Sequence, residues 1–260
     1  MIGLILGTSE GKKIVSLLNE FTDDLFISTA TAYGGQLLEK YKYKILNSKP
    51  LDVNGMIHAI NTNNIHILID ASHPYAVEVT KNAIEASRVC RIQYVRYERP
   101  SIIDKYINSK NIIIVNSYKD LYKYLINIRG NILNTTGSRN IEKILDMNLP
   151  NRIIHRVLPS SNVIEKLYKL GIRTEDIIAI KGPVSYELNY AFIKEYKVVA
   201  VLMKDSGIQG GTEEKINAIL DCGAYAFVIA RKNIQYDTQH DKVFSCERTL
   251  VEYINKKFRT

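Results

Sequence analysis

The chain has 260 residues, of which 46% are hydrophobic and 24% are charged. This length suits one large domain or two smaller ones, and the composition excludes disordered, collagenous and low-complexity chains. The longest apolar runs, such as residues 198–203, are short. A helix that crosses a bilayer needs about 20 apolar residues, and the first residues lack the basic segment of a signal peptide. We therefore expect a cytoplasmic protein without membrane-spanning segments.

The formal net charge of +8 favours an anionic partner. The excess is spread over both halves of the chain, with no basic tail or block. This distribution suits a small polyanionic ligand at least as well as a nucleic acid, whose binding sites usually form a dense basic stripe. A composition biased toward Lys, Ile and Asn explains the charge equally well. The three cysteines and five histidines show no metal-ligand spacing, so we expect neither a disulfide framework nor a metal site.

Short runs rich in β-branched residues alternate with amphipathic segments along the whole chain. This alternation is typical of repeated βα units on parallel sheets. The predicted strands are residues 2–6, 25–29, 43–46, 65–70, 92–96, 112–115, 132–135, 153–157, 177–180, 198–203 and 226–230. Apolar residues at helical spacing predict helices after the first and third strands and at the end of the chain.

Eleven predicted strands are many for one doubly wound sheet, and they suit two smaller sheets. We therefore predict an α/β protein with two Rossmann-like domains, mainly parallel sheets and a ligand cleft between the domains. No linker rich in Pro, Gly or Ser divides the chain, so strand counting sets the boundary near Gly130. The predicted domains are residues 1–128 on the cofactor side and 129–260 on the substrate side.

Three polar clusters follow strands in the first half. Residues 7–11 read GTSEG and lead into a helix, where backbone amides can receive a phosphate. The spacing fits neither G-x-G-x-x-G nor a P-loop, and a simple turn capped by Thr8 or Ser9 is the alternative. Residues 29–35 read TATAYGG and lack the acid that usually binds an NAD ribose. Residues 70–76 read DASHPYA, in which Asp70 or Ser72 could merely cap a helix and His73 could be structural.

Three comparable clusters follow strands in the second half. They read TTGSR at residues 135–139, KGPVS at 181–185 and KDSGIQGGTE at 204–213. Each combines glycine, hydroxyls and a cation, and the carboxyl ends of parallel strands share one sheet edge. Any one of these clusters is a common turn, but the set predicts a site for something large and anionic. Ser206 has no Gly-x-Ser-x-Gly context, which argues against a serine hydrolase.

In this order, the clusters resemble one known family over nearly the whole chain. The motifs are LGTSEG at 6–11, ATAYGG at 30–35, DASHPYA at 70–76, RYERP at 96–100, TTGS at 135–138, RVLP at 156–159, IKGP at 180–183, KDSG at 204–207 and GGTEEK at 210–215. They are similar to those of the precorrin-6A reductase family of cobalamin biosynthesis, in particular the cobalt-precorrin-6A reductases of the anaerobic route. Two positions depart from the pattern: Leu6-Gly7 replaces a double glycine, and Arg231-Lys232 replaces Arg-Pro.

The resemblance implies an oxidoreductase that reduces one double bond of a ring-contracted corrin precursor with a nicotinamide cofactor, NADH or alternatively NADPH. It also implies that the two domains exchange strands, so that the C-terminal segment packs on the first domain. Such a substrate is a small polycarboxylate, which suits the many cations and backbone donors of the second half. We expect a monomer or homodimer with no nucleic-acid partner.

The predicted site residues fall into three groups. The predicted cofactor-binding residues are Gly7, Thr8, Ser9, Glu10, Thr31, Tyr33, Gly34 and Ser72. The predicted substrate-binding residues are Arg99, Thr136, Gly137, Ser138, Arg139, Lys181, Lys204, Ser206, Gly207, Gly210 and Gly211. The candidate proton donors are His73, Tyr75 and Asp205, with water or a substrate carboxyl group as alternatives.

Two rival functions stay open from the sequence. A tetrapyrrole methyltransferase or a nucleotide-sugar enzyme also combines paired α/β domains with a glycine loop. A basic nucleic-acid-binding module is supported by the net charge alone.

Overall fold

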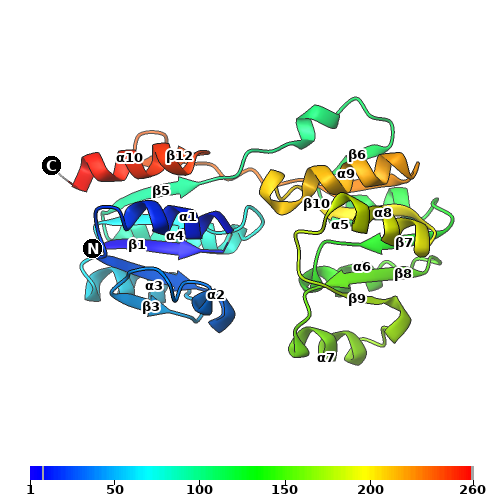
Figure 1. Cartoon of the computed structure of the whole chain (residues 1–260), viewed down its shortest axis with the longest axis horizontal. Helices are drawn as coiled ribbons and strands as arrows, with labels where there is room; N and C mark the ends of the chain where they lie inside the picture. Colours follow the sequence, from blue (N-terminus) through cyan, green and yellow to red (C-terminus); the bar gives the residue numbers. More distant parts are fainter. Residues whose placement is uncertain (8, 259–260) are drawn as a thin grey trace. The chain divides into compact units, whose positions relative to one another are not determined.

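The computed structural model of the chain describes residues 1–7 and 9–258. It divides into two compact units, each described separately below (Figure 1). Unit 1 contains Met1–Arg99 and the segment from Asn233 onward, and unit 2 contains Pro100–Lys232. Within the described residues, none of the helices has the length and apolar character that crossing a membrane requires.

Unit 1 is a parallel six-stranded sheet covered by helices on both faces. Its sheet has the order β3-β2-β1-β4-β5-β12. The elements are β1 (Ile2–Leu6), α1 (Ser9–Leu18), β2 (Leu25–Thr29), α2 (Ala32–Gln36), β3 (Ile45–Asn47), α3 (Val53–Thr62), β4 (Ile67–Ala71), α4 (Val77–Val89), β5 (Gln93–Tyr97), β12 (Asp241–Phe244) and α10 (Glu247–Phe258).

Unit 2 repeats this plan with the order β9-β8-β7-β10-β11-β6, again parallel throughout. Its strands and α-helices are β6 (Ile112–Val115), α5 (Tyr118–Leu125), β7 (Asn131–Asn134), α6 (Ile141–Leu145), β8 (Ile153–Val157), α7 (Ser161–Lys169), β9 (Ile177–Ala179), α8 (Tyr186–Glu195), β10 (Val198–Lys204), α9 (Thr212–Asp221) and β11 (Tyr225–Ile229). Its short 3₁₀ helices are η1 (Ile103–Tyr106), η2 (Ser138–Asn140), η3 (Thr174–Asp176) and η4 (Ile208–Gly210).

The two units exchange their sixth strands. Both sheets have the 3-2-1-4-5-6 order of a Rossmann fold. Strand β6 follows β5 in the chain but pairs with β11 of unit 2, whereas β12 follows β11 but pairs with β5 of unit 1. The chain therefore crosses between units twice, after Arg99 and after Lys232. The predicted pair of Rossmann-like sheets is confirmed, and the strand exchange that the family resemblance implies is present.

All eleven predicted strands form, with ends that agree within two residues, and β12 is an additional strand. The boundary expected near Gly130 differs from the observed division. Gly130 lies inside unit 2, between α5 and β7, because β6 belongs to the same sheet as β7. Strand pairing, which the local sequence does not encode, moves the division to Arg99 and Lys232.

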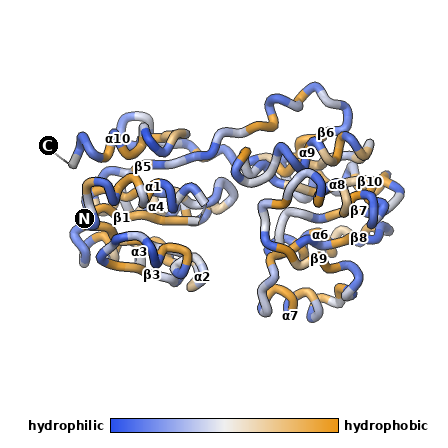
Figure 2. The backbone as a smooth tube through the Cα atoms, in the orientation of Figure 1, coloured by the Kyte–Doolittle hydropathy of each residue, from blue (hydrophilic) through white to orange (hydrophobic). Residues whose placement is uncertain are grey.

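Burial on both faces explains the apolar central strands. Every residue of β1, β2 and β4 is buried. On one face of unit 1, Ile14 of α1 and Leu250 of α10 pack on the sheet, and on the other face Met56 of α3 and Ile84 of α4 do so. Figure 2 shows β1 as hydrophobic along its length. Helices α1 and α4 leave β1 and β4 toward opposite faces, and the carboxyl ends of two such strands are where open α/β sheets bind their ligands.

Candidate functional site

In unit 1, the loops after β1 and β4 approach closely at Gly7. A Cβ atom at this position would lie 3.2 Å from the backbone nitrogen of His73 and 3.3 Å from the Cα of Ser72. The backbone amide of Gly7 donates a hydrogen bond to the carbonyl of Ala71 at 3.3 Å. Glycine therefore lets the predicted cofactor loop lie against the DASHPYA loop. Thr8, also predicted to bind the cofactor, lies outside the described residues.

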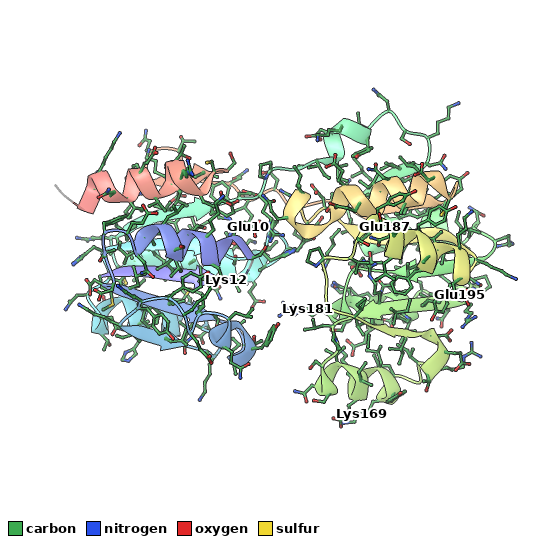
Figure 3. The ribbon with its side chains drawn as sticks, viewed as in Figure 1. Glu10, Lys12, Lys169, Lys181, Glu187 and Glu195 are labelled. Atoms are coloured by element: carbon green, nitrogen blue, oxygen red, sulfur yellow. The ribbon has the colours of Figure 1, made fainter. Side chains whose placement is uncertain are left out.

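The start of α1 holds a buried ion pair. Glu10 and Arg99, which are 4% and 5% exposed, form a direct ion pair. Ser9 Oγ donates to Glu10 Oε2 at 2.8 Å, and Arg99 Nη2 donates to Ser9 Oγ at 3.2 Å. Figure 3 shows Glu10 at this end of α1. Two predicted cofactor residues and one predicted substrate residue thus meet at the same point within unit 1.

The predicted residues after β2 form the first turn of α2. Thr31 is the N-cap, and its side-chain oxygen accepts a hydrogen bond from the amide of Gly34 at 3.1 Å. Tyr33 is 45% exposed at the same sheet edge. As the N-cap, Thr31 gives the amide of Gly34 a hydrogen-bond acceptor that the first turn of a helix otherwise lacks. Tyr33 and Leu37 are the exposed large hydrophobic residues of this short helix and its C-cap.

A buried network fixes the loop after β4. Asp70 and Arg96 are 0% and 1% exposed, and Arg96 Nη1 lies 2.9 Å from Asp70 Oδ1. Tyr94 donates its hydroxyl proton to Asp70 Oδ2 at 3.0 Å, and burial together with the Asp70 charge raises the pKa of Tyr94 well above its usual value. Ser72 receives a hydrogen bond from Arg96 Nη1 at 3.0 Å. Ser72, a predicted cofactor residue, is therefore 5% exposed and held in place by Arg96.

Two of the three candidate proton donors lie together in unit 1. The rings of His73 and Tyr75 have centroids 5.8 Å apart, and both residues are half-buried. The backbone amide of Tyr75 donates to Nδ1 of His73 at 3.3 Å. When the imidazole is neutral, this bond makes Nδ1 the acceptor and leaves the proton on Nε2.

In unit 2, the loops after β7 and β10 are joined by Lys204. Its Nζ donates to the backbone carbonyl of Thr136 at 2.8 Å. Burial, followed by the charges of Arg139 and Lys143, lowers the pKa of Lys204. Gly137 and Ser138 continue this loop into η2. The predicted substrate residues after β7 and β10 therefore lie side by side, with several cations close together.

The rest of the β10 loop is held by internal contacts. Asp205, the third candidate proton donor, is 3% exposed and lies 3.2 Å from Arg231 Nη2. Its Oδ1 also accepts from the amide of Gly207 at 3.1 Å. The amide of Ser206 donates to Thr212 Oγ1 at 3.0 Å. This side of the loop is built from turns and an ion pair, and Gly210 ends η4 there.

Gly211 brings the β10 loop against the loop after β9. It adopts a left-handed conformation with φ of 68°, and a Cβ there would lie 3.0 Å from Pro183 Cβ. Lys181 precedes this contact and is exposed (Figure 3). The KGPVS and KDSGIQGGTE clusters, which are about 20 residues apart in sequence, therefore meet at one sheet edge.

Two cations were missed by the sequence analysis, the buried Lys215 and the half-buried Arg156. Lys215 of α9 is 9% exposed, and burial, together with the charge of Arg156, lowers its pKa to about 7. Arg156 in β8 donates from Nη1 to Asn189 Oδ1 at 2.7 Å, and burial lowers its pKa to about 10. Within residues 1–7 and 9–258, neither cation pairs with an acid. Both stand in the motifs that carry the family resemblance, which was the available signal.

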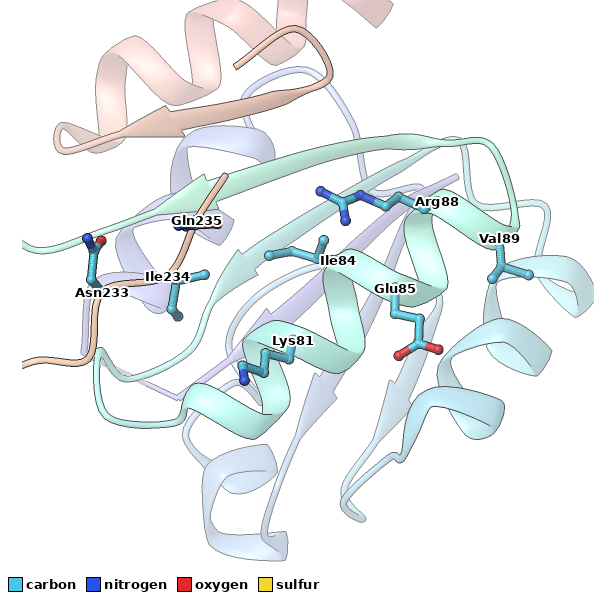
Figure 4. Close-up of a pocket in the computed structure, with 8 residues that line it drawn as sticks. All are labelled: Lys81, Ile84, Glu85, Arg88, Val89, Asn233, Ile234 and Gln235. Atoms are coloured by element: carbon cyan, nitrogen blue, oxygen red, sulfur yellow. The ribbon is translucent and has the colours of Figure 1, made fainter. Parts of the chain in front are cut away.

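One hollow in unit 1 lies apart from the predicted site residues. It is bounded by α4 and by the segment that follows the second crossing (Figure 4). The lining residues are Lys81, Ile84, Glu85, Arg88, Val89, Asn233, Ile234 and Gln235. Its mixed charges give it no evident preference for an anion or a cation.

Known proteins resemble this chain over nearly its full length. A family model described as "Precorrin-6x reductase CbiJ/CobK" matches residues 1–254. The cobalt-precorrin-6A reductase of Methanocaldococcus jannaschii is 33% identical over 252 residues, which cover 96% of each chain. That of Priestia megaterium is 32% identical over 254 residues, 96% of this chain and 98% of the relative.

A solved structure described as "CobK precorrin-6A reductase" has the same fold. It matches 98% of this chain and 97% of its own length with a TM-score of 0.75, at 14% sequence identity. The structural likeness confirms the fold, whereas the family model and the two relatives establish that the chain is homologous to this family. The chain belongs to the precorrin-6x reductase family.

Proposed function

We propose that this chain reduces one double bond of cobalt-precorrin-6A to give cobalt-precorrin-6B, with unit 1 binding a reduced nicotinamide cofactor and unit 2 binding the substrate. Family membership makes it an oxidoreductase of cobalamin biosynthesis and disfavours the methyltransferase, nucleotide-sugar and nucleic-acid alternatives. The cobalt-bearing substrate is proposed because both relatives named above are cobalt-precorrin-6A reductases.

The cofactor is assigned to unit 1 because of the loop that begins at Gly7. A glycine turn runs from β1 into the ten-residue helix α1, and the N-terminal end of a helix favours phosphate. In unit 2, the equivalent strand β7 leads instead into the short helices η2 and α6. The residues after β2 supply neither an acid for a ribose hydroxyl nor an arginine for a 2′-phosphate. We propose NADH as the donor, with NADPH as the alternative.

The substrate is assigned to unit 2 because cations gather at the carboxyl edge of its sheet. These are Arg139, Arg156, Lys181, Lys204 and Lys215. The single observation that carries this assignment is the neighbouring pair of the buried Lys215 and the half-buried Arg156, which has no acidic partner among the described residues. Two neighbouring like charges with little access to solvent are unfavourable unless an anion joins them. The acetate and propionate carboxylates of a corrin precursor supply such anions.

The reaction needs one hydride and one proton. The nicotinamide supplies the hydride, and because its carbon must come within about 3–3.5 Å of the acceptor, positioning dominates the rate. Asp205 accepts one hydrogen bond from the amide of Gly207 and pairs with Arg231, so its carboxylate already serves to hold the β10 loop. We propose His73 as the proton donor, through Nε2, with Tyr75 as the next candidate. Each donates a proton without a metal.

The test is anaerobic incubation of the purified protein with cobalt-precorrin-6A and each nicotinamide in turn. We expect loss of reduced-nicotinamide absorbance in a one-to-one ratio with a product that carries two more hydrogen atoms. Consumption of the substrate without nicotinamide oxidation, or only with S-adenosylmethionine, would refute the proposal. A cytoplasmic location is part of the proposal and suits the three free cysteines, Cys90, Cys222 and Cys246. We propose a monomer or homodimer.

A further inference from the structure

Two arginines occupy equivalent positions in the two units. Strands β5 and β11 are the fifth strands of their sheets, and they end at Tyr97 and Ile229. Arg99 and Arg231 each lie two residues beyond these ends, at the points where the chain is about to leave its unit. Each arginine turns back to a loop of its own unit.

In unit 1, Arg99 neutralises the acid of the proposed cofactor loop. Its guanidinium pairs with Glu10 and donates to Ser9, the first two residues of α1. An unpaired carboxylate at this helix start would repel a diphosphate, and in a buried site that repulsion is weakly screened. The positive charge of Arg99 compensates the negative charge of Glu10. Its guanidinium also holds Ser9 and Glu10 in place through hydrogen bonds. Arg99 is 5% exposed and contacts Ser9 and Glu10 directly, so it can stabilise the conformation of the loop.

In unit 2, Arg231 performs the equivalent task on the β10 loop. Its Nε donates to the backbone carbonyl of Asp205 at 3.1 Å, and Nη2 lies 3.2 Å from the Asp205 carboxylate. Nη2 also donates to the carbonyl of Pro100 at 3.4 Å. Asp205 in turn orders Gly207 through its Oδ1. The contacts place Arg231 at the base of the loop that carries Lys204, and they neutralise an acid beside the proposed carboxylate site.

We propose that Arg99 and Arg231 are positioning residues, each of which neutralises one acid and holds the ligand loop of one unit: Arg99 for the cofactor and Arg231 for the substrate. This inference rests on the proposed assignment of the ligands to units 1 and 2. It replaces the expectation that Arg99 binds a substrate carboxylate. The contacts described above lie within unit 1 for Arg99 and within unit 2 for Arg231, so we expect the two replacements to have separable effects.

The test compares Arg99→Met and Arg231→Met with two matched controls that also remove an arginine. The controls are Arg88→Met on α4 of unit 1 and Arg173→Met in unit 2, both exposed and ion-paired. The dissociation constant of NADH, and of NADPH, is measured calorimetrically without substrate. The KM for cobalt-precorrin-6A is measured anaerobically at saturating cofactor. Circular dichroism and thermal unfolding show whether each variant is folded.

We expect the two arginine variants to have opposite effects, one on cofactor binding and the other on the substrate KM. Arg99→Met raises the cofactor dissociation constant about tenfold or more and leaves the substrate KM within about twofold, while Arg231→Met does the reverse. Glu10→Gln combined with Arg99→Met regains most of the lost cofactor affinity, because the repelling charge is gone. Arg99→Lys retains more affinity than Arg99→Met, since it keeps the charge but not the forked hydrogen bonds. Both controls behave as the wild type.

The outcomes separate this inference from the proposed function. A rise in substrate KM with unchanged cofactor affinity in Arg99→Met would make Arg99 a substrate ligand and overturn the inference alone. Failure of the Glu10→Gln change to restore affinity would overturn the charge argument. Wild-type protein that binds nicotinamide but does not reduce cobalt-precorrin-6A would refute the function and leave the Arg99 measurement valid. Wild-type protein that binds neither nicotinamide would refute both.

Discussion

Replacing Lys215 with methionine removes a buried charge and keeps the shape of the side chain. Burial and the nearby Arg156 lower the pKa of Lys215 from 10.5 to about 7. A shift of this size corresponds to about 5 kcal/mol of unfavourable free energy when the amine is charged in the folded protein. The unfolded chain has the ordinary lysine pKa, so the two states bind different numbers of protons above about pH 7.

The sign of the effect follows from this difference. Between about pH 7 and 10.5 the unfolded chain keeps the proton that the folded protein has lost, so folding stability rises with pH over that window. Below about pH 7 both states are charged, and the full penalty is present. The stability advantage of Lys215→Met over the wild type is therefore largest near pH 6 and about 3 kcal/mol smaller near pH 9.

The assay is urea unfolding of the wild type and Lys215→Met at pH 6 and pH 9. Comparing the two proteins at each pH cancels the titration of all other groups. Lys169→Met, which removes an exposed lysine of α7, controls for the loss of one charge. A difference between Lys215→Met and the wild type that stays constant with pH, or grows toward pH 9, would show that Lys215 is charged throughout and would refute this reasoning.

Three further predictions test the buried network and the two ligand loops. Asp70→Asn leaves Arg96 buried without its carboxylate, and we expect a loss of about 3–5 kcal/mol in unfolding free energy, measured with urea. A loss below about 1 kcal/mol would show that water replaces the pair. Gly7→Ala presses a methyl group on the backbone of His73, so we expect weaker nicotinamide binding by calorimetry at unchanged substrate KM. Lys204→Ala raises the substrate KM far more than the cofactor dissociation constant, and equal losses in both would contradict its assignment.

The sequence predicts the strands well because burial on both faces leaves a simple signal. A short, continuous apolar run such as β10, which lies between two helical segments, is typical of a strand that is buried on both faces. Strand β12 lacks that signal: it spans four residues, Asp241–Phe244, contains two charged side chains and lies at a sheet edge. Strand β6, by contrast, is recognisable, but nothing in its four apolar residues encodes the sheet it joins. The misplaced boundary follows from that missing information.

The candidate site is predictable only where its residues follow a strand. Parallel strands place such residues at one edge, and so Gly7 does meet His73 and Thr136 does meet Lys204. Side chains in the interior escape this rule. Apart from its place in the GGTEEK motif, Lys215 has no sequence feature that reveals its burial, because its low exposure depends on how α9 packs on α8 and the sheet. An ion pair such as Glu10 with Arg99, 89 residues apart, is equally invisible before folding.

The exchange of strands makes unit 1, the proposed cofactor unit, depend on the last part of the chain. Helix α10 places Leu250 and Ile254 in the core of unit 1, and Glu247 accepts a hydrogen bond from the Tyr97 hydroxyl at 3.0 Å. The amide of Glu98 donates to Phe244 of β12 at 2.8 Å, immediately before Arg99. Residues 1–99 alone therefore lack both the edge that continues β5 and part of their apolar cover. The anchor of Arg99, and with it the proposed cofactor loop, is completed only when the chain has returned from unit 2.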